Sequence, residues 1–170
     1  MKKLIIILII GLLLSPFAYK GARVVYYKYL HYKAKQLEGA KVDSINIIDT
    51  NGKNYNLKEL KGKNVVLVFW ASWCKYCIDE IPSIKKFYTN KTDDTLLITA
   101  SIDKNSKDAL NAIKEHNMSY PVVIKNSNNS EFFSYFKNTQ VPSIWVIDKN
   151  GVIVAQNLLH ISDTQKILKK

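Results

Sequence analysis

The sequence has few residues of the types that break regular structure or cross-link a chain. Its 170 residues include six glycines, four prolines, two cysteines and a single arginine. So little glycine and proline excludes collagen-like and linker-like chains. Only one long apolar run is present, which excludes a transporter with many membrane spans. Apolar residues (47%) and charged residues (23%) are near globular averages, and the length fits one domain with a tail at either end.

Acidic residues are also in the minority, with 14 against 25 basic residues and a formal charge of +11. Nucleic-acid binding is the first function that such a charge suggests. However, residues 1–38 hold seven of the basic residues and one acidic residue, which leaves a net charge of +5 on the remainder. That remainder has no run of basic residues and no aromatic-basic motif. We therefore expect no nucleic-acid partner.

Residues 4–19 form the apolar run, 16 residues long. This length lies between a signal-peptide core and the roughly 20 residues of a comfortable membrane span. The nearby alanines that could end a signal peptide would place proline or lysine at position −3, which is unfavourable for cleavage. We predict an uncleaved signal anchor over residues 1–23 and a juxtamembrane helix over 24–38, whose aromatic and basic residues suit the membrane interface. A cleaved signal peptide is the alternative.

The charges beside this run bear on the orientation of the chain. More basic residues follow the run than precede it, so the positive-inside rule alone would place the domain in the cytoplasm. The chemistry of the domain favours the opposite side, as argued below.

Residues 39–170 have the pattern of one α/β domain. Residues 65–70 are apolar without polar alternation, which is typical of a central strand covered by helices on both faces. Strand-like and helical segments alternate, and two Asn-Gly turns mark an N-terminal β-hairpin and a closing antiparallel hairpin. We predict a mixed central sheet with flanking helices, and we expect residues 103–106 to cap its second helix. The strands are expected at 42–48, 55–57, 65–70, 95–102, 120–124, 143–148 and 152–155, and the helices at 77–90, 106–117, 131–137 and 162–170.

Both cysteines, Cys74 and Cys77, lie where the buried strand gives way to a helix. A thiolate there faces the unpaired N–H groups of the helix, which make it nucleophilic, and a second thiol one turn later can close a disulfide. A purely structural bridge would close a very small loop and stabilise little. A zinc site would need more ligands than the three scattered histidines supply. Redox chemistry is the interpretation that we favour.

Residues 65–77, which read VVLVFWASWCKYC, resemble the active-site segment of the thioredoxin fold. Glu80 and Pro82, with residues 60–63, narrow the resemblance to membrane-tethered thiol-disulfide oxidoreductases of the TlpA/ResA/CcmG type. Residues 141–143 and 147–151 resemble the cis-proline loop and closing hairpin of that family. The resemblance covers residues 40–157.

The resemblance implies a role for each site residue. Cys74 would be the exposed attacking thiolate and Cys77 the buried resolving thiol. Pro142 would be cis and face the disulfide, with the backbone of Val141 and the side chain of Trp73 offered to an incoming substrate. Glu80 would accept the proton of Cys77, a task that thioredoxins proper give to a buried aspartate.

Two further positions bear on the roles expected of Glu80 and Cys74. Thioredoxins proper carry their buried aspartate where this chain has Val68. Lys75 adds a positive charge beside Cys74, and we expect it to favour the thiolate.

The resemblance further implies an enzyme that reduces disulfides in client proteins, such as apocytochrome c, with electrons from an integral-membrane thiol carrier. The domain would be periplasmic and tethered to the inner membrane by a single pass, where a lone reactive pair has no stray thiol to mispair with. We expect no cofactor and no metal.

Three alternatives remain at this point. The first is an oxidant that introduces disulfides into exported proteins. The second is a copper-handling protein, which would want more widely spaced cysteines and a histidine ligand. The third is a thiol peroxidase, whose threonine three residues before the attacking cysteine is replaced here by Ala71.

Overall fold

The computed structural model describes residues 21, 37–42, 44–136 and 140–169. The predicted signal anchor and juxtamembrane helix lie outside these residues, except for Gly21, Leu37 and Glu38. Within the described part of the chain, we find no helix with the length and apolar character needed to span a bilayer. Residues Glu38–Lys170 form one compact unit, and the account below concerns that unit.

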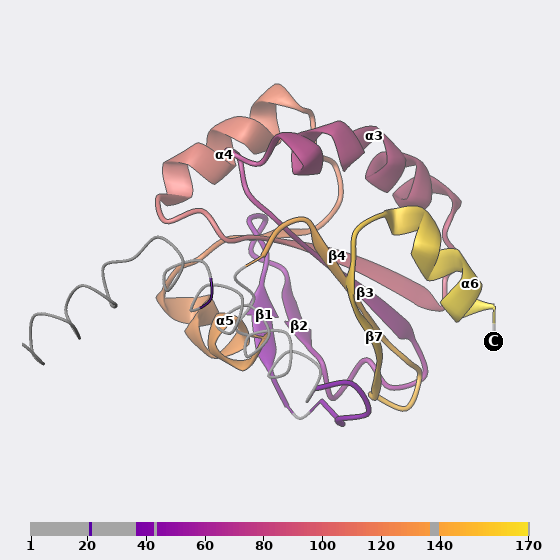
Figure 1. Cartoon of the computed structure of the whole chain (residues 1–170). Helices are drawn as coiled ribbons and strands as arrows, with labels where there is room; N and C mark the ends of the chain where they lie inside the picture. The colour runs from indigo at the N-terminus through magenta and orange to yellow at the C-terminus, as the bar shows by residue number, and fades with distance from the viewer. Residues whose placement is uncertain (1–20, 22–36, 43, 137–139, 170) are drawn as a thin grey trace, which may run out of the picture. The chain divides into compact units, whose positions relative to one another are not determined.

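A five-stranded mixed sheet forms the centre of this unit, with the strand order β5-β4-β3-β6-β7 (Figure 1). Strand β3 pairs in parallel with β4 and antiparallel with β6. A separate antiparallel hairpin, β1-β2, precedes the sheet in the sequence. The predicted α/β sheet with a mixed edge and an N-terminal hairpin is therefore confirmed. The strands are β1 (Asn46–Ile48), β2 (Asn54–Asn56), β3 (Asn64–Trp70), β4 (Thr95–Ser101), β5 (Val122–Val123), β6 (Ser143–Ile147) and β7 (Ile153–Leu158).

Helices cover both faces of β3, as its uninterrupted apolar sequence predicts. Val66, Val68 and Trp70 belong to one buried cluster with residues of α3 and α4, and Leu168 of α6 packs against this cluster. On the other face, Phe69 stacks on Phe132 of α5 at a centroid distance of 5.7 Å. Figure 1 shows α3 and α4 together on one side of the sheet, with α5 beside the hairpin on the other. The helices are α3 (Lys75–Asn90), α4 (Ser106–Glu115), α5 (Ser130–Phe136) and α6 (Thr164–Leu168), with 3-10 turns at Ser127–Asn129 and Ile161–Asp163.

Both predicted Asn-Gly turns are present and share one geometry. Gly52 and Gly151 have φ angles of +81° and +80°, a conformation that favours glycine. In each turn the carboxylate of an aspartate, Asp49 or Asp148, accepts hydrogen bonds from two backbone N–H groups. These local contacts explain why the turns could be located from the sequence.

Several segment boundaries differ from the prediction. The first strand is shorter than 42–48, and the last strand extends to Leu158 rather than residue 155. The C-terminal helix covers only Thr164–Leu168, after a 3-10 turn. The prediction that residues 103–106 cap the second helix holds only for Asn105, whose side chain accepts from the N–H of Lys107 at 3.1 Å. The side chain of Asp103 turns instead toward the loop after β3.

Candidate active site

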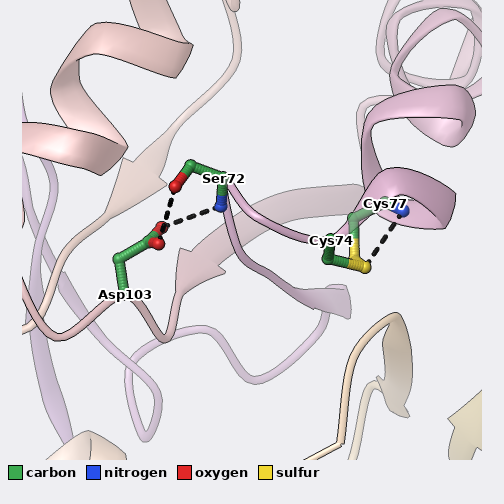
Figure 2. Close-up of a disulfide and its surroundings, with 4 residues drawn as sticks. All are labelled: Ser72, Cys74, Cys77 and Asp103. Carbon is green, nitrogen blue, oxygen red and sulfur yellow. Dashed lines mark hydrogen bonds between the residues drawn. A yellow bond between two sulfur atoms is a disulfide. The ribbon is translucent and has the colours of Figure 1, made fainter.

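The only two cysteines of the chain form a disulfide at the junction between β3 and α3 (Figure 2). Cys74 is the N-cap of α3, and its sulfur accepts a hydrogen bond from the N–H of Cys77 at 3.2 Å. The sulfur therefore lies at the positive end of a 16-residue helix, beside N–H groups that lack partners within the helix. This position stabilises a thiolate once the disulfide is opened.

The disulfide is less exposed than the sequence led us to expect. Cys74 is 6% exposed and Cys77 is 2% exposed, and both belong to the buried cluster beneath α3. The expectation of an exposed Cys74 is therefore wrong for the disulfide form. The reason is local, because the Cys74 side chain folds back over the first turn of the helix to reach Cys77.

Two aromatic side chains beside the disulfide are exposed instead. Trp73 is 68% exposed and Tyr76 is 78% exposed, although both are large and apolar. Burial of an aromatic side chain is favourable, so two exposed aromatic side chains next to a reactive disulfide are typical of a surface that contacts another molecule. Trp70, three residues before Trp73, is buried in the core.

Lys75 pairs with a neighbour on α3. Its ammonium group pairs with the carboxylate of Asp79 at 2.8 Å, one turn along the helix. The hydrogen bond from Lys75 to Asp79, and then the charge of Asp79, raise the pKa of Lys75 above its usual value. Both side chains are exposed, so solvent screens this pair, and the effect of Lys75 on the Cys74 thiolate stays a prediction.

Glu80 lies on α3, and its side chain is only 15% exposed. Its carboxylate accepts a hydrogen bond from the N–H of Ile161 at 2.9 Å and lies 3.4 Å from Nδ1 of His160. In the disulfide form the carboxylate is thus held against the segment that follows β7. His160 itself is largely exposed.

The Val141–Pro142 peptide bond is cis, as the resemblance implied. Ser143 pairs with Phe69, so the next step of this antiparallel register places Pro142 beside Trp70, at the end of β3. Val141 packs against the buried cluster that contains both cysteines. The topology therefore brings this loop to the same end of the sheet as the disulfide, although Pro142 follows Cys77 by 65 positions in the sequence.

Asp103 is the site residue that the sequence interpretation missed. It is 3% exposed, and its carboxylate accepts hydrogen bonds from the N–H of Ser72 at 3.0 Å and from the hydroxyl of Ser72 at 2.8 Å (Figure 2). The available signal was its position two residues after β4, because the carboxyl ends of the parallel strands β3 and β4 meet at one edge of the sheet.

A metal site requires several ligands that converge on one point. Among the described residues, no group of three or more histidine, cysteine, aspartate or glutamate side chains is arranged to hold a metal ion.

Comparisons with known proteins agree with this geometry. A family model described as Redoxin matches residues 37–169. A thiol-disulfide oxidoreductase ResA of Bacillus cereus is 30% identical over 123 residues, which cover 72% of this chain and 70% of that protein. ResA of Bacillus subtilis (strain 168) is 27% identical over 118 residues, or 69% of this chain and 65% of that protein.

A solved structure is similar over the same part of the chain. The thioredoxin domain of the thiol-disulfide oxidoreductase BVU-2223 from Bacteroides vulgatus matches with a TM-score of 0.64 and 25% identity. The match covers 78% of this chain and 96% of that domain.

Proposed function

Because this chain belongs to the Redoxin family and is a thioredoxin-fold thiol-disulfide oxidoreductase related to ResA, we propose that it reduces disulfides in client proteins. The observation that carries this proposal is the Cys74–Cys77 disulfide at the N-terminus of α3. Both cysteines of the chain are used in it, so a redox cycle of this pair leaves no third thiol to mispair.

The reaction follows from the positions of the two sulfurs. The Cys74 thiolate attacks one sulfur of the client disulfide, forms a mixed disulfide and releases a client thiolate. Cys77 then loses its proton and attacks the Cys74 sulfur, which closes the Cys74–Cys77 disulfide and releases the second client thiolate. Two electrons pass to the client in each cycle. An external thiol carrier must then return two electrons to the pair.

The proposed setting is the outer face of the cytoplasmic membrane. Residues 1–23 would anchor the chain in a single pass, an integral-membrane thiol carrier would supply electrons, and apocytochrome c would be a client. The support for this setting is the apolar run at the N-terminus and the resemblance to the TlpA/ResA/CcmG group. Thiol pairs that cycle outside the cytoplasm also escape the reducing thiols of the cell interior.

Trp73, Val141 and Pro142 are proposed to contact the client. Trp73 offers an exposed indole on one side of Cys74. The loop that contains Val141 and Pro142 lies at the same end of the sheet and offers backbone groups to an extended chain.

The direction of electron flow can be tested through the equilibrium reduction potential of the pair. Tyr76 stands directly before the second cysteine, where the related family usually has proline, so the potential cannot be taken from relatives. We expect a value near about −250 mV or below, measured against glutathione or dithiothreitol buffers with the full chain. A value near about −120 mV would contradict the reductase and assign the pair to disulfide formation.

Glu80 is proposed to accept the proton that Cys77 loses before it attacks. It lies three residues after Cys77, about one helical turn away on α3. In the disulfide form Cys77 has no thiol proton to give up, and the Glu80 carboxylate instead accepts a hydrogen bond from the N–H of Ile161, near the end of β7. The carboxylate would turn to Cys77 when the disulfide is reduced.

Glu80→Gln should slow turnover in the insulin-reduction assay by about tenfold or more and change its pH dependence, since an amide cannot accept the proton. The fold should survive, because the amide oxygen of glutamine can still accept from Ile161. Glu115→Gln at the end of α4 is the matched control, with the same chemical change and no expected effect. A pH dependence equal to that of the unmodified protein would remove the role assigned to Glu80.

A further inference from the structure

Asp103 holds a buried carboxylate at the carboxyl end of β4. The carboxylate accepts three hydrogen bonds, two from Ser72 at 3.0 and 2.8 Å and one from the hydroxyl of Ser101 at 2.6 Å. The backbone N–H of Asp103 also donates to the Ser101 hydroxyl at 3.0 Å. Both oxygens of the carboxylate are therefore fixed, and Ser72 supplies two of the three donors.

Ser72 lies within the tight turn that leads to the disulfide. The N–H of Cys74 donates to the carbonyl of Ala71 at 3.1 Å, which closes a turn over Ala71–Cys74 with Ser72 as its second residue. On the near side of this turn, the N–H of Ile102 donates to the carbonyl of Trp70 at 2.8 Å and continues the pairing of β3 with β4. The bonds to Asp103 extend this attachment from the strand into the turn.

The sheet itself does not need these bonds. Strands β3 and β4 already pair over seven residues, from Asn64 with Thr95 to Trp70 with Ser101. Burial of a carboxylate costs free energy unless its hydrogen bonds compensate. Beyond the strand pairing, the hydrogen bonds between Asp103 and Ser72 fix the position of the turn before Cys74.

We propose that the Asp103–Ser72 pair positions Cys74 in the reduced form of the enzyme. While the disulfide is closed, the bond to Cys77 also holds the Cys74 sulfur at the N-terminus of α3. When the disulfide opens, that covalent constraint is lost, and the turn is held by its own hydrogen bonds and by Asp103. The stabilisation of a thiolate by helix N–H groups acts only within the first turn, so it depends on where the sulfur lies.

Asp103 and Ser72 are thus positioning residues, since neither needs to touch the client. The inference rests on the thiol-disulfide chemistry of Cys74 and not on the direction of electron flow. A potential that contradicted the proposed reductase would leave it intact.

The test uses the full chain in a Cys77→Ser background, in which Cys74 is the sole thiol. The apparent pKa of Cys74 is measured from the ultraviolet absorbance of the thiolate, and its reactivity from the rate with dithiobis(nitrobenzoic acid). Ser72→Ala removes the hydroxyl bond at 2.8 Å and leaves the backbone bond in place. We expect the pKa of Cys74 to rise by about half a unit to one unit and the rate at neutral pH to fall about threefold to tenfold.

Three further variants make the result specific. Ser72→Thr keeps a hydroxyl and should restore both values. Ser44→Ala removes a hydroxyl that bonds with Asn56 near the N-terminal hairpin, and it should change neither. In an Asp103→Ala background the Ser72 hydroxyl has lost its acceptor, so the effect of Ser72→Ala should fall to half or less, whatever the loss of the carboxylate does by itself.

The proposal is overturned if Ser72→Ala lowers only the midpoint of thermal unfolding and leaves the pKa and rate of Cys74 unchanged. It is also overturned if Ser72→Ala has its full effect in the Asp103→Ala background, because the two side chains would then act separately.

Discussion

Cys74→Ser should abolish the reduction of insulin disulfides, leaving only the rate of the reductant alone. The attacking group in thiol-disulfide exchange is a thiolate, and a serine hydroxyl is not ionised at neutral pH and forms no stable bond to the client sulfur. The measurement is the turbidity of insulin in dithiothreitol, with and without the variant.

This loss should not reflect unfolding. Serine is among the preferred N-cap residues, so Cys74→Ser keeps a side-chain acceptor at the start of α3. The lost disulfide closes a loop with only two residues between the cysteines, so it contributes little to the free energy of unfolding. Circular dichroism and thermal unfolding provide the check. Appreciable activity in a folded Cys74→Ser variant would show that another group attacks the client.

Cys77→Ser should instead cause mixed disulfides between Cys74 and its clients to accumulate. Without the resolving thiol, the second step of the cycle cannot occur, and the complex persists until an external thiol releases it. Cells that express the full chain are quenched in acid, alkylated and resolved on non-reducing gels. Bands that disappear on reduction, and that are absent from the Cys74→Ser/Cys77→Ser double variant, are the expected result.

Identification of the trapped partners by mass spectrometry then tests the proposed clients. Partners with two cysteines close together, as in apocytochrome c, would support the reductase. Failure of Cys77→Ser to trap any protein would count against client reduction, even if the small-molecule reactions of Cys74 remained normal.

The amino-acid sequence alone was sufficient for the family, the fold class and the redox pair. These depend on local patterns, such as the apolar strand before Cys74 and the two Asn-Gly turns. Hydrogen bonds that close such turns join residues at most a few positions apart, so the pattern specifies the contact. The same local logic located β3 at the centre of the sheet, because a strand without polar alternation must be covered on both faces.

The partners of the charged side chains were decided by the tertiary structure. Asp103 has the sequence position of a helix cap, yet it bonds with Ser72, 31 residues away, where parallel strands end side by side. Glu80 bonds with the N–H of Ile161, 81 residues away, because the segment after β7 packs against α3.

A carboxylate has no sequence preference among donors and binds those that the packing of strands and helices brings within about 3 Å. The sequence by itself therefore determined which atoms react, while the tertiary structure decided which groups hold them in place.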